Sequence, residues 1–220
     1  MRPLLLGFLL LLTLPAGASA AADLRFTLET SGGVRFGTPH EMEGFLNDNG
    51  LPLAGQPVEI QARPFPFDGE FETIATVTTE DNGGFGLRRK FNRNVQLRAF
   101  APNQFVVSPE RRAYVFPRPR SVFKALPRSR LRITQFLRTP VGVRLTARTN
   151  FYLARPGAKS APRVATAKPK RIGRGRFKAV ATVRLPRAWK GGFRYGSCFR
   201  YSEGSGLGDP KASCPKRYRF

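Results

Sequence analysis

Residues 57–63 read Pro-Val-Glu-Ile-Gln-Ala-Arg, and residues 95–99 read Val-Gln-Leu-Arg-Ala. In both runs an apolar residue alternates with a polar one. On an extended backbone, a period of two places one set of side chains on a core and the other set in water. These runs therefore predict strands with one buried face, and they decide the fold class.

The same alternation recurs along the chain, in residues 75–78, in Val143, Leu145 and Ala147, and in Phe177, Ala179, Ala181 and Val183. Between the runs, residues 47–50 (NDNG) and 81–84 (DNGG) are expected to form hairpin turns, because Asn and Gly tolerate positive φ. Short antiparallel strands separated by such turns predict an all-β protein built from β-sandwiches.

Charge divides the chain into two parts. Residues 22–117 carry 12 acidic and 10 basic side chains, a net charge of −2. Residues 118–220 carry 27 Lys and Arg and only Glu203 and Asp209, a net charge of +25. A weak internal repeat agrees with this division, because Gly84-Phe85 and Arg176-Phe177 each open a strand, a turn and a further strand. Residues 116–120 (FPRPR) read as a stiff, extended linker, so we expect tandem sandwiches over 22–117 and 118–220.

The N-terminus predicts export. Arg2, an apolar run over residues 4–14 and the small residues Ala18-Ser19-Ala20 form a signal peptide over residues 1–20, with an uncleaved anchor as the alternative. No second apolar run is long enough to span a bilayer, so we expect no transmembrane segment after cleavage and a secreted or cell-surface protein.

Two cysteines in an exported chain predict one disulfide bond, between Cys198 and Cys214. A metal or redox pair is disfavoured because the sequence has no CxxC motif and no nearby histidine.

Residues 51–101 resemble a known type of module. The run LPLAGQPVEIQARP, the Gly-x-Phe segment GGFGLRRKF and the strand VQLRAFA resemble carboxypeptidase regulatory-like (prealbumin-like) and bacterial Ig-like domains. The C-terminal GGFRYGSCFRY and SCPKRYRF resemble the closing segment of two-domain exported bacterial proteins. The resemblance implies two tandem Ig-like or prealbumin-like β-sandwiches in an accessory role, as a spacer, a support or a binding module.

Residues with catalytic chemistry are scarce. His40 is the single histidine, in residues 38–41 (TPHE), and we expect it in an exposed loop with no nucleophile beside it. Asp68, Glu70 and Glu72 lack the DxDxDG pattern of a calcium loop and read as solvated edge charges. We therefore expect no enzymatic activity, no cofactor and no metal.

The basic residues of the second part are the strongest functional signal. Arg128, Arg130 and Arg132 would project from one face of a strand. The candidate anion-binding residues are Lys168, Lys170, Arg171, Arg174 and Arg176 in a glycine-containing loop, and Arg187, Lys190, Arg194 and Arg200 around Trp189, Tyr195, Phe199 and Tyr201. Interleaved cations and aromatics suit a polyanion. Outward-facing arginines of ordinary solvated strands are the competing interpretation.

The leading hypothesis is a non-enzymatic exported module that associates with an anionic cell-envelope polymer or lipid surface through residues 118–220. Export excludes cytosolic nucleic acid as the partner, and the oligomeric state stays open. The alternatives are a purely structural exported Ig-like protein and a carbohydrate-binding accessory module, which exposed aromatic side chains would favour.

Overall fold

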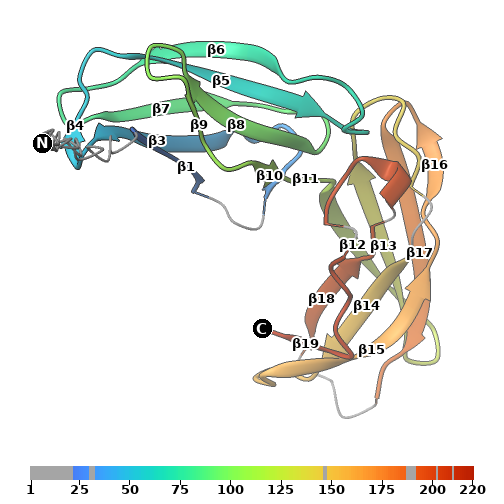
Figure 1. The fold of residues 1–220 in the computed structure, drawn as a ribbon. Coiled ribbons are helices and arrows are strands. Elements are labelled where there is room, and N and C mark those ends of the chain that lie inside the picture. The colour runs from blue at the N-terminus through green and yellow to red at the C-terminus, as the bar shows by residue number, and fades with distance from the viewer. Residues whose placement is uncertain (1–21, 30–32, 146–147, 187–191, 202, 210) are drawn as a thin grey trace, which may run out of the picture.

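The computed structural model describes residues 22–29, 33–145, 148–186, 192–201, 203–209 and 211–220. The predicted signal peptide lies outside the described residues. The described chain consists of strands and one short 3-10 helix, η1 (Glu203–Ser205), which confirms the expected all-β class. Figure 1 shows a bent molecule in which the two halves of the chain, residues 22–117 and residues 118–220, meet at a corner beside η1.

The N-terminal half (22–117) contains two facing sheets. The first is made of β1 (Asp23–Leu28), β3 (His40–Asp48), the short β4 (Leu51–Pro52) and β7 (Gly84–Arg89). The second is made of β5 (Pro57–Pro64), β6 (Glu72–Thr78), β8 (Val95–Ala101), β9 (Val106–Val107) and β10 (Arg111–Ala113). One buried cluster joins their inner faces, with Phe26 and Met42 from one sheet against Ile60 and Leu97 from the other, so the two sheets form a sandwich.

The C-terminal half (118–220) repeats this arrangement. Its first sheet is made of β12 (Arg118–Leu126), β13 (Arg130–Arg138), β17 (Arg176–Arg184) and β16 (Lys170–Gly173), in that order. Its second sheet is made of β18 (Arg194–Phe199), β14 (Thr149–Ala154), β15 (Ser160–Ala167) and β19 (Arg217–Arg219). Ile133 and Ala179 of the first sheet pack against Phe151 and Leu153 of the second.

The two halves share one strand order. The sheet β1-β3-β7 faces β8-β5-β6 in the N-terminal half, and β12-β13-β17 faces β18-β14-β15 in the C-terminal half. The two repeated segments of the sequence occupy equivalent places in the two halves. In each, the chain leaves one sheet and enters the facing sheet, from β7 to β8 in the N-terminal half and from β17 to β18 in the C-terminal half. The weak repeat in the sequence therefore reflects a repeated connectivity.

The junction between the halves is packed rather than spaced by a linker. Residues 116–120 are extended as expected, but β11 (Val115–Phe116) pairs with β2 (Val34–Arg35) and β12 begins at Arg118. A buried cluster at the junction takes Val115, Phe36 and Phe91 from one half and Leu137, Phe177 and Leu207 from the other. That each half folds on its own stays a prediction.

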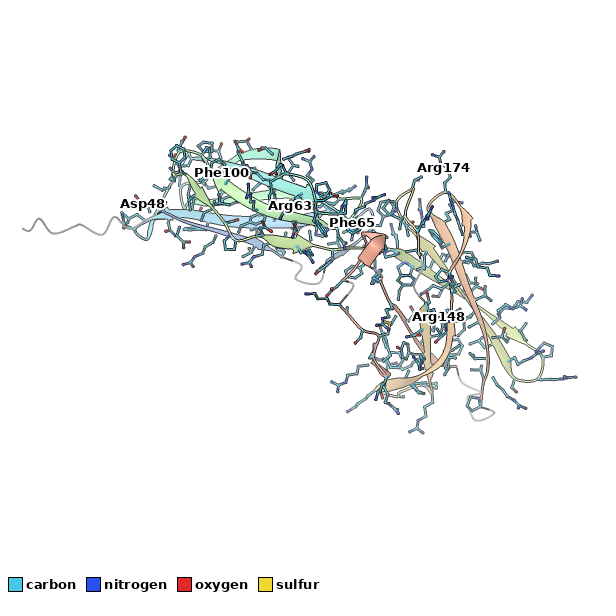
Figure 2. The ribbon with its side chains drawn as sticks, turned by 45° about the vertical axis from the view of Figure 1, so that its right-hand side comes forward. Asp48, Arg63, Phe65, Phe100, Arg148 and Arg174 are labelled. Atoms are coloured by element: carbon cyan, nitrogen blue, oxygen red, sulfur yellow. A yellow bond between two sulfur atoms is a disulfide. The ribbon has the colours of Figure 1, made fainter. Side chains whose placement is uncertain are left out.

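The predicted disulfide is confirmed. Cys198 and Cys214 are bonded, with Cα atoms 5.6 Å apart, and they close the loop that carries η1. This loop contacts the N-terminal half through Asn94, whose backbone N–H donates to the Gly206 carbonyl (2.8 Å) and whose side-chain N–H donates to the Gly208 carbonyl (2.7 Å). Phe65, labelled at the junction in Figure 2, lies against Gly206.

Two strand-level expectations were wrong. Residues 143–148 were expected as a strand, but the described residues 143–145 and 148 are in no strand and β14 begins at Thr149; residues 146 and 147 lie outside the described residues. Val143 and Leu145 are buried because they pack into the junction cluster, not because they pair in a sheet. The turn at 81–84 exists, with Gly83 at φ 78°, but it joins β6 and β7 of different sheets and is not a hairpin. The turn at 47–50 is a hairpin as expected, with Asn49 and Gly50 at positive φ.

Candidate anion-binding surface

His40 is not the exposed loop residue that the sequence suggested. It is the first residue of β3 and is fully buried, with its ring 5.5 Å from that of Phe91. Neither ring nitrogen has a hydrogen-bond partner, and burial lowers the pKa of the imidazole. Because it is buried and hydrogen-bonded to no side chain, His40 belongs to the core.

The first group of predicted anion-binding residues lies on a β-hairpin rather than in a loop. Lys170 and Arg171 are in β16, Arg176 opens β17, and Lys168 precedes them; all four are exposed. Arg174 occupies the turn and projects from the tip of the hairpin in Figure 2. Gly175, at φ 60°, allows the turn because L-residues avoid this conformation. The hairpin forms one edge of the first C-terminal sheet.

The second group belongs to the other sheet. Arg194 is on β18, donates to the Ala158 carbonyl (2.9 Å) and lies over the Phe220 ring at 4.3 Å. Arg200 is exposed just after β18. Arg187 and Lys190 lie outside the described residues. The structure therefore does not gather the seven predicted residues that it describes into one site, because β16 and β18 are in different sheets.

Three aromatic residues of this second group, Tyr195, Phe199 and Tyr201, turn inward, and Trp189 lies outside the described residues. Tyr195 packs against Phe123, and Tyr201 packs between Phe116 and Phe199. Burial raises the pKa of both tyrosine hydroxyls. These rings fill the cores and do not offer stacking faces to a ligand.

Strand register assembles a surface that the sequence did not reveal. Arg118 of β12 lies opposite Arg138 of β13, and Arg138 lies opposite Arg176 of β17, so three arginines form one row across three adjacent strands. In the next row on the same face, Arg120 is opposite Phe136, which is opposite Lys178, which is opposite Lys170. Directly paired residues share a face of the sheet.

The far end of the same face is also basic. Lys124 lies opposite Arg132, and Arg130 lies opposite Arg184. Arg128 was expected in one strand with Arg130 and Arg132, and this expectation was wrong. Arg128 lies with Ser129 in the β12–β13 turn, where both residues have positive φ. We call the outward side of this sheet the basic sheet face; its cations are Arg118, Arg120, Lys124, Arg130, Arg132, Arg138, Lys170, Arg176, Lys178 and Arg184.

No carboxylate offsets this charge within the sheet, since residues 118–138 and 170–184 contain neither Asp nor Glu. Among the described residues, the ion pairs are Asp23–Arg25, Glu110–Arg63 and Glu41–Arg88, all in the N-terminal half. Two like charges 4 Å apart repel by about 1 kcal/mol in water and by about 4 kcal/mol near a protein surface. An anion on this face would relieve that repulsion.

A hollow of about 500 Å³ lies at the Arg118 end of the basic sheet face. Its cations are Arg118, Arg120, Arg138 and Arg176, and its apolar lining includes Pro119, Phe136 and Ile172. The side chain of Ile172 is half exposed. The hollow therefore combines positive charge with an accessible apolar surface.

The described residues contain no group of three or more His, Cys, Asp or Glu side chains that could hold a metal ion. They also contain no helix long and apolar enough to cross a membrane. No protein-family model matches the chain, and no curated protein matches it.

Proposed function

We propose that the protein is a non-enzymatic module that binds an extended anionic polymer through the basic sheet face. The observation that carries the proposal is the set of ten cations on one side of a four-stranded sheet with no carboxylate among them. Strands lie about 4.8 Å apart and alternate residues along a strand about 6.7 Å apart, so the cations form a two-dimensional array suited to a repeating anion.

The predicted signal peptide indicates that the partner lies outside the cytoplasm. The predicted signal peptide and the Cys198–Cys214 disulfide support a secreted or cell-surface protein, although only the disulfide lies in the described part of the chain. The resemblance to prealbumin-like and bacterial Ig-like modules supports an accessory role. We therefore assign the polymer to the cell envelope, with phosphate or carboxylate groups as its repeating charge.

The competing hypotheses receive less support. A carbohydrate-binding module needs exposed aromatic platforms, and the exposed phenylalanines among the described residues, Phe105, Phe123 and Phe220, come from separate segments of the chain, with only Phe105 largely exposed, at 87%. A purely structural role leaves a +25 half of the chain without a partner to offset its self-repulsion.

The test compares two variants of equal net charge on binding of labelled inorganic polyphosphate, at a series of salt concentrations. The face variant carries Arg120→Gln, Arg132→Gln, Arg138→Gln and Lys178→Gln. The matched control carries Arg148→Gln, Arg155→Gln, Arg163→Gln and Lys159→Gln, which alter exposed cations away from this face. Arg148 is labelled in Figure 2.

We expect binding of the unaltered protein to weaken linearly with the logarithm of salt concentration, by about 0.7 of a unit of slope per phosphate neutralised on a single strand. The face variant should bind at least about tenfold more weakly than the control, with a shallower slope, because it loses direct contacts. Equal weakening of both variants, or binding that ignores salt, would contradict the proposal.

A further inference from the structure

We propose that the hollow at the Arg118 end of the basic sheet face binds a phosphate monoester that carries a hydrocarbon chain. This inference rests on the proposed function and names a ligand for one part of the same surface.

The arginine row selects a compact group with more than one negative charge. Arg118, Arg138 and Arg176 are direct cross-strand neighbours, so their Cα atoms fall within about 10 Å. Guanidinium groups bind phosphate and carboxylate oxygens in a bidentate manner. A phosphate monoester carries a charge of about −1.5 to −2 at pH 7 and offers three acceptor oxygens, so it matches a row of three arginines better than a carboxylate, which has one charge and two oxygens.

The apolar lining selects a ligand that is not purely ionic. Phe136 lies in register between Arg120 and Lys178, at a position where an all-polar surface would serve a polyanion better. Ile172 on β16 extends the apolar area within the hollow. An apolar chain joined to the phosphate would cover this area and remove it from water.

The dimensions agree with an organic ligand. Small-molecule sites in proteins have volumes of roughly 300–1,000 Å³, with mostly apolar linings and a few orienting polar groups. The hollow has about 500 Å³ and four arginines at its rim. Inorganic phosphate alone would leave most of that space to water.

The same chemistry occurs in a free alkyl phosphate and in a phosphate headgroup exposed on a lipid bilayer. Titration calorimetry on residues 21–220 at pH 8 tests the site itself. The ligands are inorganic phosphate and three octyl compounds, octyl phosphate, octanoate and octyl glucoside, each of the three kept below its critical micelle concentration. Sedimentation with phosphatidylcholine vesicles, with and without phosphatidic acid, distinguishes the source.

We expect octyl phosphate to bind at least tenfold more tightly than inorganic phosphate or octanoate, and octyl glucoside not to bind. Arg138→Gln should weaken octyl phosphate at least tenfold. The control Arg163→Gln removes an exposed arginine of β15, in the other sheet and away from the basic sheet face, and should change the affinity less than twofold. Ile172→Ser should weaken octyl phosphate and leave inorganic phosphate unchanged.

Vesicle binding that needs both phosphatidic acid and Arg138 identifies a lipid headgroup as the source of the phosphate. Binding of dissolved octyl phosphate without binding to the vesicles identifies a free alkyl phosphate. Octanoate binding as tight as octyl phosphate would overturn the assignment to phosphate. Octyl phosphate binding no tighter than inorganic phosphate, while polyphosphate still binds through the face, would overturn this inference and leave the proposed function standing. Equal effects of Arg138→Gln and Arg163→Gln would also overturn it.

Discussion

At the scale of single residues, His40 is the clearest case of a polar group in an apolar place. Its ring is fully buried beside Phe91, and both nitrogens lack a partner. Protonating the imidazole there would bury an uncompensated charge, so burial lowers its pKa below the ordinary 6.5. The neutral form is the one that the folded chain tolerates.

This burial predicts that acid weakens the fold through His40. Above pH 6.5 the imidazole is neutral in both the folded and the unfolded chain. As the pH falls below 6.5 the unfolded chain takes up the proton first, so the free energy of unfolding declines, by at most about 1.4 kcal/mol per pH unit from this one group. Denaturant titrations between pH 7.5 and 5.5 should show this decline, and His40→Leu should flatten it.

The control is Met42→Leu, two residues along β3 and equally buried, which should keep the slope of the unaltered protein. Glu29 acts in the opposite direction, because its hydrogen bond with Glu41 raises its pKa and protonation then favours the folded chain. If His40→Leu left the pH dependence unchanged, the decline would come from other groups.

The misplacement of His40 shows what local sequence can settle. Residues 38–41 were interpreted as a loop, but only a turn precedes the strand, with the Thr38 N–H donating to the Arg35 carbonyl (2.9 Å), and β3 begins at His40. Packing against Phe91, about fifty positions away, accompanies the burial of the His40 side chain. No pattern within residues 38–41 records that contact.

At the scale of strands, alternation predicted which residues face inward with good accuracy. Val58, Ile60, Val95, Leu97, Phe177 and Ala179 are all buried as expected. The basic sheet face could not be predicted in the same way. Its central row joins Arg118, Arg138 and Arg176, and only the pairing of β12, β13 and β17 brings these positions side by side. Register between strands is a non-local property, whereas alternation is a local one.

The turn before β8 gives a prediction at this scale. The buried Asn94 side chain donates to the Gly208 carbonyl (2.7 Å) and accepts from the Val115 N–H (2.9 Å). Asn94→Ala would leave both backbone groups without these partners, and each such loss costs about 1–3 kcal/mol. We expect a drop of about 2–4 kcal/mol in the free energy of unfolding, measured by denaturant titration.

Asn92→Ala is the matched control, because Asn92 lies in the same turn but is exposed. Its effect should stay within about 0.5 kcal/mol, as is usual for surface positions. Comparable losses in the two variants would show that the turn itself, rather than the buried hydrogen bonds of Asn94, stabilises the junction.

At the scale of the whole molecule, the disulfide-closed loop of the C-terminal half forms part of the interface with the N-terminal half. Figure 1 shows η1 at the corner where the two halves meet. Leu207 of this loop is buried in the junction cluster with Val115, and the Gly208 N–H donates to the Val115 carbonyl (2.8 Å). Both the charge division and the repeated strand order suggested two units, but neither indicated that the units share a core.

This arrangement predicts that a bond in one half protects an amide in the other. The Asn94 N–H donates to the Gly206 carbonyl, which lies between the two cysteines in sequence. Closing a loop of this length stabilises a fold by roughly 3 kcal/mol, so the variant Cys198→Ser with Cys214→Ser should let the loop open more often. Hydrogen exchange measured by mass spectrometry or NMR should then be faster at the Asn94 amide.

The Ala99 amide is the internal reference. It donates to the Ser108 hydroxyl (2.9 Å) within the N-terminal half and has no partner in the loop, so local opening of the loop should leave its exchange rate unchanged. Faster exchange at Asn94 with constant exchange at Ala99 would show that the disulfide holds the junction. Equal acceleration at both amides would mean that the two halves unfold as one unit. Constant exchange at both would mean that the junction is held without the disulfide, by the apolar cluster around Val115 and Leu207.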